Sequence, residues 1–208
     1  MTARADAAAE TGRRVVAAAK ALFMERDYED VTLADVAADA DVTVQTVIRR
    51  FKSKEGLATV VADEIGSDIR SSREVSRPGD VAEAIHLLVA SFEAMGGMNW
   101  RLLRQGHRIP LIGERLRLAR AAHRAWIEAC FAPLLPRRGA ARERRILSLF
   151  VATDFYAWKL LRLDLGLPPA EVERVMCEMA KAITGTSRGA AVDGEASVRR
   201  GGAARGRA

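Results

Sequence analysis

The chain has 208 residues, 49% of them hydrophobic, which is enough for one large or two small domains and argues against a disordered chain. Residues 1–10 lack the apolar stretch of a secretion signal, and no apolar run is expected to reach membrane-spanning length, so we expect a cytoplasmic protein without a membrane partner. The net charge is +6, two distant cysteines predict reduced thiols, and three scattered histidines predict neither metal nor cofactor.

Hydrophobic periodicity predicts helices throughout the chain and no strand. Apolar residues spaced from Val15 to Phe23 predict an amphipathic helix of about 15–20 residues, which ends near residues 26–30. A second helix begins at Thr32, which can cap it, with Asp35 in its first turn. A third, short helix opens at Thr43, and Ser53 can cap a fourth helix that runs to about Ser72.

The third helix has the residue types that read DNA. Val44, Val47 and Ile48 are expected to face inward, leaving an amide, a hydroxyl and guanidinium groups outside. Arg can pair with guanine and Gln with adenine, a Thr methyl can meet a thymine methyl, and capped helix starts can bind phosphate. The predicted DNA contacts are Thr32, Thr43, Gln45, Thr46, Arg49, Arg50, Lys52 and Lys54. The alternative is a solvated basic face.

Charge along the chain supports a local rather than a general attraction to DNA. Residues 1–75 carry 11 basic and 14 acidic residues, a net charge of −3, whereas residues 76–185 have a net charge of +6. However, residues 43–54 contain no acid and four bases, and phosphates respond to such a patch within a Debye length.

The second half predicts further helices. Pro78-Gly79 separates them from the first four, and the expected ranges are 81–95 with a break at Gly96, a short segment 98–106, and then 110–134, 140–165 and 169–184. Residues 186–208 are rich in Gly, Ala, Ser and Arg and are expected to be disordered.

Large apolar side chains with a few polar ones suggest a small-molecule pocket among helices 81–165. The candidate ligand contacts are Phe92, Met95, Trp100, His107, Trp126, Phe150, Asp154 and Trp158. The alternative is that these residues only pack in a core. Asp154 lies in an apolar stretch, where it can orient a ligand, pair with an Arg, or lie at a dimer seam. Arginines 101, 104 and 108 could bind a weakly anionic ligand, the alternative being that they lie on the surface without a ligand.

A family resemblance rests on the run RRVVAAAKALFMERDYEDVTLADVAADADVTVQTVIRRFKSKEGL. It resembles the N-terminal domain of tetracycline-repressor (TetR)-type transcriptional regulators over roughly residues 11–65. The resemblance implies an all-α fold of about nine helices. It also implies three parts: a three-helix helix-turn-helix domain with its connecting helix (1–75), an effector-binding and dimerisation domain (76–185), and the disordered tail (186–208).

Two positions depart from the family pattern. Asp41 stands where the turn usually has Gly, and we expect it to adopt the left-handed conformation at some cost. Ile48, Arg49 and Arg50 replace a Tyr-x-His pattern, which removes a hydroxyl contact to phosphate and adds a cation.

The resemblance implies a ligand-responsive regulator, a repressor in most of the family. It would bind a palindromic operator as a homodimer and be released by a small, mostly apolar effector. Helices 140–165 and 169–184 would pair with those of a second copy, the alternative being intramolecular packing. A helical interaction protein that no longer reads DNA is the competing function. An enzyme is disfavoured, because the sequence offers no nucleophile–base pair and no phosphate loop.

Overall fold

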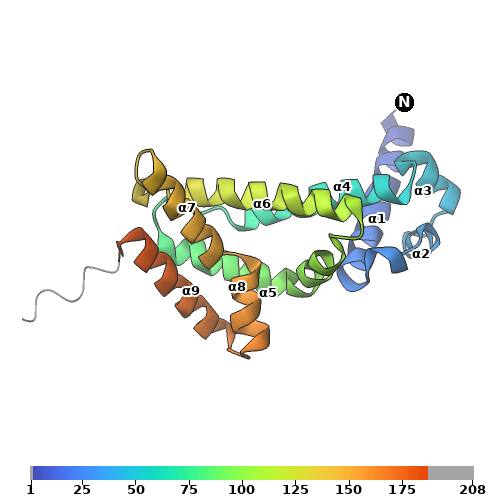
Figure 1. The fold of residues 1–208 in the computed structure, drawn as a ribbon. Coiled ribbons are helices and arrows are strands. Elements are labelled where there is room, and N and C mark those ends of the chain that lie inside the picture. Colours follow the sequence, from blue (N-terminus) through green and yellow to red (C-terminus); the bar gives the residue numbers. More distant parts are fainter. Residues whose placement is uncertain (1, 187–208) are drawn as a thin grey trace, which may run out of the picture.

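The computed structural model describes residues 2–186, and in this range the chain is helical and contains no strand (Figure 1). The helices are α1 (Thr2–Glu25), α2 (Leu33–Asp39), α3 (Val44–Phe51), α4 (Lys54–Ser72), α5 (Val81–Gln105), α6 (Pro110–Cys130), α7 (Ala140–Ala152), α8 (Phe155–Lys159) and α9 (Pro169–Thr184). Short 3-10 helices cover Tyr28–Asp30 (η1) and Ala132–Leu134 (η2), and a π-helix covers Leu160–Asp164 (η3). The all-α prediction is confirmed. The predicted tail lies, except for Thr186, outside the described residues.

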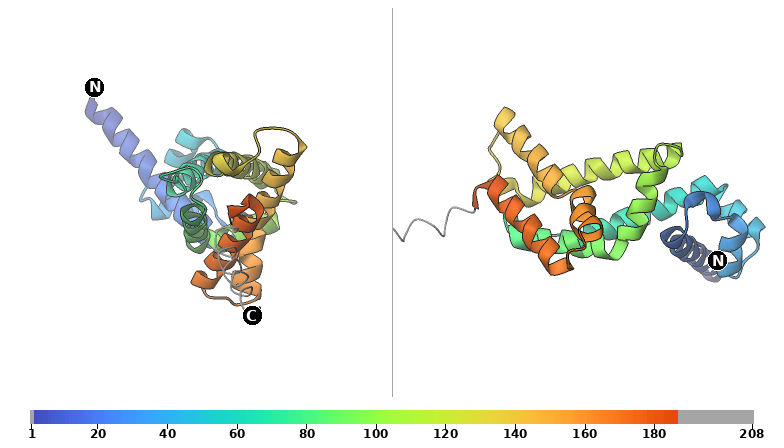
Figure 2. Two further views of the ribbon diagram at one scale, coloured as in Figure 1. Left: turned by 90° about the vertical axis from the view of Figure 1, so that its left-hand side faces the viewer. Right: turned by 60° about the horizontal axis from the view of Figure 1, so that its bottom comes forward.

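The chain has two separate hydrophobic cores. One lies among α1 to α4 and includes Val15, Val36, Val47 and Leu57. The other lies among α5 to α9 and includes Ile85, Leu88, Phe131 and Met176. Helices α1 to α3 gather at one end of the molecule and α7 to α9 at the other, while α4, α5 and α6 run between them (Figures 1 and 2).

Helix α5 continues through the break predicted at Gly96. It packs against α9, α6, α1 and α8, so tertiary contacts outweigh the low helix propensity of the two glycines. A Cβ at Gly96 would collide with the ring of Trp158, and the glycine therefore lets α8 approach α5 closely. By length and composition α5 alone among the described helices could cross a membrane, contrary to the sequence-based expectation, but half of that window is buried in the fold.

The predicted helix 140–165 is also wrong as a single element. Helix α7 ends at Ala152, and Asp154 caps α8 by accepting a hydrogen bond from the backbone N–H of Tyr156 at 2.9 Å. Asp154 thus has a role that none of its sequence-based alternatives included. By contrast, α9 covers the predicted range 169–184, starting with Pro169 in its first turn and followed by Gly185 in the left-handed conformation.

Candidate functional site

The turn between α2 and α3 is built on Asp41. Its φ is 51°, its N–H donates to Ala38 O at 3.1 Å, and the N–H of Val42 donates to Ala37 O at 3.0 Å. These two bonds make the Schellman end of a helix, which usually needs a glycine at the left-handed position. The expectation that Asp41 adopts this conformation is confirmed, and the sharp turn sets α3 across the end of α2.

Both ends of α3 are held by local hydrogen bonds. Thr43 caps its start by accepting from the N–H of Thr46 at 3.2 Å, and the two hydroxyls lie 3.0 Å apart. At its end Lys52 has a φ of 71°, and Ser53 N donates to Phe51 O at 2.9 Å, which makes a strained three-residue turn. Ser53 then caps α4 through the N–H of Gly56. A Cβ at Gly56 would collide with the carbonyl of Phe51, which explains this glycine.

The outer face of α3 differs from the predicted one. Val47 is fully buried, but Val44 and Ile48 are each 38% exposed and lie one turn apart beside the exposed side chains of Gln45 and Arg49. The assignment of Val44 and Ile48 to the inner face is therefore wrong. A helix of eight residues over a small core buries only a narrow stripe, so the two β-branched side chains are left outside together with the amide and the guanidinium.

Several predicted DNA contacts are already engaged within the protein. Arg50 donates to Ala8 O of α1 at 2.9 Å. Its guanidinium lies against Gly12, where a Cβ would collide with it. Lys54 lies 4.3 Å from the ring centre of Tyr28, and burial lowers its pKa. The hydroxyl and N–H of Thr32 both donate to Asp35 in a capping box. Lys52 reaches back to Arg49 O at 3.1 Å.

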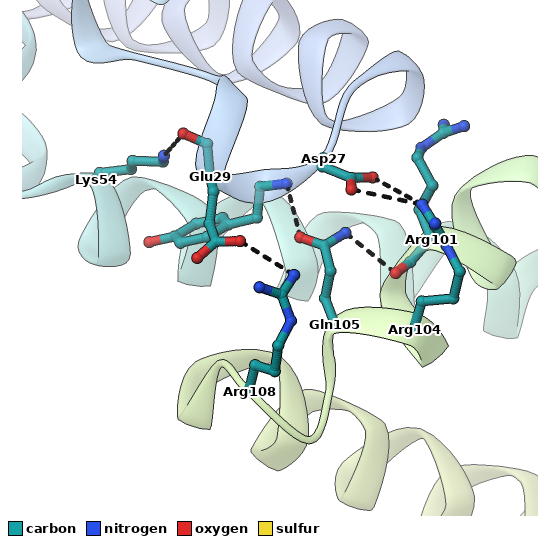
Figure 3. A network of polar contacts seen from close by, with 8 residues as sticks. Asp27, Glu29, Lys54, Arg101, Arg104, Gln105 and Arg108 are labelled. Atoms are coloured by element: carbon teal, nitrogen blue, oxygen red, sulfur yellow. Dashed lines mark hydrogen bonds and ion pairs between the residues drawn. The ribbon is translucent and has the colours of Figure 1, made fainter.

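The acidic residues of the first part pair with arginines of the second. Arg104 lies 3.5 Å from Asp27, and Arg108 lies 3.2 Å from Glu29 (Figure 3). On α6, Arg115 pairs with Asp63. Between the first two pairs, Gln105 accepts from the backbone N–H of Tyr28 at 3.0 Å (Figure 3). The arginines of the second part thus neutralise some of the net negative charge of residues 1–75. The acids concerned lie outside α3.

The eight predicted ligand contacts do not form one site. Trp158 is 3% exposed, donates to Glu93 and packs with Phe92 and Phe155, while His107 is exposed in the loop after α5. Trp100 packs on the core under the ammonium group of Lys159, at 4.5 Å. Met95 lines a hollow of about 520 Å³ between α1 and α5, which Met24, Met98 and Arg101 also line. No three His, Cys, Asp or Glu side chains gather as metal ligands within residues 2–186.

Two of the eight do come together around a residue that sequence reasoning did not select, His123. Its ring stacks on Trp126 at 5.4 Å and meets the edge of Phe150 at 5.1 Å. Trp126 donates to the carbonyl of Arg73 at 3.0 Å, and the guanidinium of Arg73 lies 4.8 Å from the ring centre of Phe92. Nothing in the local sequence around Arg73 marks it, because its neighbours come from α5 and α6.

An all-helical chain with a capped helix-turn-helix at one end, and a larger helical domain behind it, defines the class of DNA-binding transcriptional regulators with a separate second domain. Residues 15–61 match the model of the bacterial regulatory proteins of the tetR family. Residues 15–61 are therefore similar to the DNA-binding part of that family, and the described residues share the all-α fold of TetR-type regulators. Among curated proteins, none matches the chain significantly.

Solved structures share the fold at low sequence identity. A tetR-family transcriptional regulator from Streptomyces coelicolor has a TM-score of 0.70 at 19% identity, covering 85% of this chain and 81% of its own. A transcriptional regulator from Rhodococcus sp. Rha1 has a TM-score of 0.65 at 19% identity, covering 84% and 96%. SmeT in its triclosan complex has a TM-score of 0.61 at 16% identity, covering 83% and 90%. These structures show the fold, and the match of residues 15–61 supports a DNA-binding regulator.

Proposed function

We propose that this protein is a cytoplasmic, homodimeric repressor that binds a palindromic operator and is released by a small effector. The observation that carries the proposal is the outer face of α3, where Gln45 and Arg49 stand exposed beside Val44 and Ile48 beyond a firmly capped turn. Amide, guanidinium and apolar groups on one short helix are the types that recognise base edges in a major groove.

We divide the predicted DNA contacts into three groups by their exposure and their partners. Gln45 and Arg49 are proposed to meet base edges, and Thr43 and Thr46 to meet a phosphate at the start of α3. Lys52 is exposed at the other end of α3 and bonds only to Arg49 O of the same helix, so it is also proposed to contact the phosphate backbone. Arg50, Lys54 and Thr32 have partners inside the protein, so we assign them first to holding the domain together and only second to phosphate.

A second copy of the chain is the proposed partner of an exposed apolar surface at the far end of the molecule. This surface is formed by Leu147, Val151, Tyr156, Leu160, Leu163 and Leu165. Each of these side chains is at least half exposed, and contiguous apolar patches on soluble proteins mark interaction sites. A single α3 covers only a few base pairs, so a two-fold axis through this surface would supply the second half-site.

Residues 76–185 are the proposed sensor, and residues 1–75 the proposed DNA-reading part, because each range has its own hydrophobic core. Helix α4 starts next to α3 and ends beside the sensor core, so it links the two parts. An effector that shifts the end of α4 changes the separation of two α3 helices in a dimer. Effector and operator then oppose each other by the same coupling free energy, about 1–3 kcal/mol.

Selection of bound fragments from a random duplex library tests the proposal and gives the operator. We expect an inverted repeat whose half-sites lie about one helical turn apart. Arg49→Ala should relax the preference at one base position, whereas the matched variant Arg120→Ala, on the exposed side of α6, should leave it unchanged. Failure to enrich any sequence, with retained folding, would favour the competing role as a helical interaction protein.

A further inference from the structure

The side chain of Arg73 is a cation held at the sensor core. Arg73 ends α4, and its Nε donates to Ser91 Oγ of α5 at 3.0 Å. Its guanidinium lies over the face of Phe92 at 4.8 Å, and its carbonyl accepts from Trp126 Nε1 of α6. Contacts from two other helices therefore hold this residue in one orientation.

No carboxylate balances this cation among residues 2–186. Arg73 forms no ion pair there, and burial lowers its pKa to about 10 without an offsetting acidic neighbour. Its terminal nitrogens have no hydrogen-bond partner among the described residues, and neither is a fully buried atom. A charge removed from water without a counter-charge is costly, so the arrangement favours an anion at those two nitrogens.

The groups beside Arg73 are flat and apolar, with one acceptor. The hydroxyl of Thr153 donates to Leu149 O at 2.7 Å, so it accepts from Nε2–H of His123 at 3.0 Å and leaves Nδ1 of that ring unprotonated. Burial and the charge of Arg73 lower the pKa of His123 to about 4, which keeps the ring neutral. Trp126 and Phe150 enclose the imidazole.

We propose that Arg73, Ser91, His123 and Trp126 form the recognition site for a small organic carboxylate with a flat apolar body. The carboxylate pairs with the two free nitrogens of Arg73, because a guanidinium matches two oxygens side by side. The apolar body replaces the contact between the rings of His123 and Trp126. Both rings are only partly buried, so a ligand can reach them, whereas Phe92 beneath the guanidinium is buried in the core.

The site also connects to the proposed switch, and this step rests on the proposed function. Arg73 directly follows Ser72 as the C-cap of α4, so an anion that pulls its guanidinium acts directly on the end of the helix that leads to α3. Binding at Arg73 is measurable without DNA, and the effect on the operator is measurable separately. The recognition site and the repressor role can therefore fail independently.

Ligand-observed saturation-transfer NMR with benzoate, phenylacetate and hexanoate, each beside its primary amide, tests the site on the full chain. We expect the aromatic acids to bind and their amides to bind at least about tenfold more weakly, since a charged hydrogen-bonded pair is lost. Hexanoate should bind more weakly than the aromatic acids. Equal binding of acids and amides, or no binding of any acid at millimolar concentration, would overturn the assignment.

Substitutions at Arg73 and at a nearby arginine show where the acids bind. Arg73→Met should abolish the difference between acid and amide, Arg73→Lys should retain part of it, and Arg70→Met, on the exposed side of the same helix, should leave it intact. Should Arg73→Met fail to fold, Ser91→Ala serves instead. It removes the hydrogen bond that orients the guanidinium of Arg73, so it should weaken the binding of the acids and leave that of the amides unchanged. Loss of the difference in Arg70→Met, or its persistence in Arg73→Met, would place the anion elsewhere. An acid that binds at Arg73 without changing operator affinity would support the site and contradict the repressor mechanism.

Discussion

The side-chain oxygen of Gln105 accepts a hydrogen bond from the backbone N–H of Tyr28 at 3.0 Å, across 77 residues of sequence. Gln105 is 2% exposed, and its amide nitrogen donates to Arg101 O at 3.1 Å. Ion pairs of Arg104 with Asp27 and of Arg108 with Glu29 flank it (Figure 3). The end of α5 and the loop after it are therefore joined by a hydrogen bond and two ion pairs to the segment that leads into the helix-turn-helix.

Replacing Gln105 by Leu should destabilise the protein and weaken coupling between its two parts. The change leaves the N–H of Tyr28 without its partner, which costs about 1–3 kcal/mol in the free energy of unfolding. Denaturant unfolding measures it, with His107→Ala in the adjacent exposed loop as the control. A Gln105→Leu protein as stable as its parent would show that water satisfies Tyr28 equally well.

The exposed methyl groups of Val44 and Ile48 should read the methyl groups of thymine. We expect deoxyuridine in place of thymidine opposite α3 to cost about 1 kcal/mol per methyl contact, with the base pairing unchanged. Ile48→Ala should remove part of that difference. Binding to substituted and natural duplexes is compared by fluorescence anisotropy, with deoxyuridine outside the half-sites as the control. Identical affinities would mean that these side chains do not touch the groove.

The left-handed residue Asp41 should be replaceable by glycine with a gain in stability. At a φ of 51° glycine avoids the steric cost that a Cβ imposes, so Asp41→Gly should raise the free energy of unfolding by about 1 kcal/mol. Ala38→Gly, at an exposed position within α2, should have the opposite sign and cost about 0.5–1 kcal/mol. Thermal and denaturant unfolding of both variants measure this. If the free energy of unfolding changed in the same direction in both variants, this would argue against backbone strain at Asp41.

A charge in the exposed apolar surface should separate the proposed dimer. Val151 is 72% exposed, so Val151→Asp should leave the fold intact, while a second copy would have to bury the carboxylate. Sedimentation measures the expected shift to monomer, and operator affinity should fall with it. The control is Ala122→Asp on the exposed side of α6. Dimers that persist at micromolar concentration in Val151→Asp would move the interface elsewhere.

Acid should destabilise the protein through His123. Its pKa is lowered from 6.5 to about 4 in the folded state, so the neutral ring contributes stability above pH 6.5 and loses it as the pH falls toward 4. Between pH 7 and pH 5 this amounts to about 2 kcal/mol. His123→Phe should unfold with a smaller pH dependence over this range, and His107→Phe should not. A His123→Phe protein with the full dependence would assign it to other groups.

Local sequence determined much of the DNA-reading part. Thr32, Thr43 and Ser53 each cap the helix that was predicted to start beside them, because a cap depends only on residues within one turn. The left-handed Asp41 followed from the family resemblance, in which the turn usually has Gly at this position. The start of α9 followed from the segment LGLPP at its N-terminal end.

Tertiary structure decided what local patterns do not contain. Gly96 was read as a helix break, yet Trp158 packs on it and α5 continues, because burial of an indole outweighs the propensity of one residue. Val44 and Ile48 are outside because few neighbours cover an eight-residue helix. Arg73 was indistinguishable from any surface arginine until α5 and α6 placed Ser91, Phe92 and Trp126 around it. Periodicity shows which side of a helix is apolar. Which polar side chain becomes buried depends on the packing of helices that are distant in the sequence.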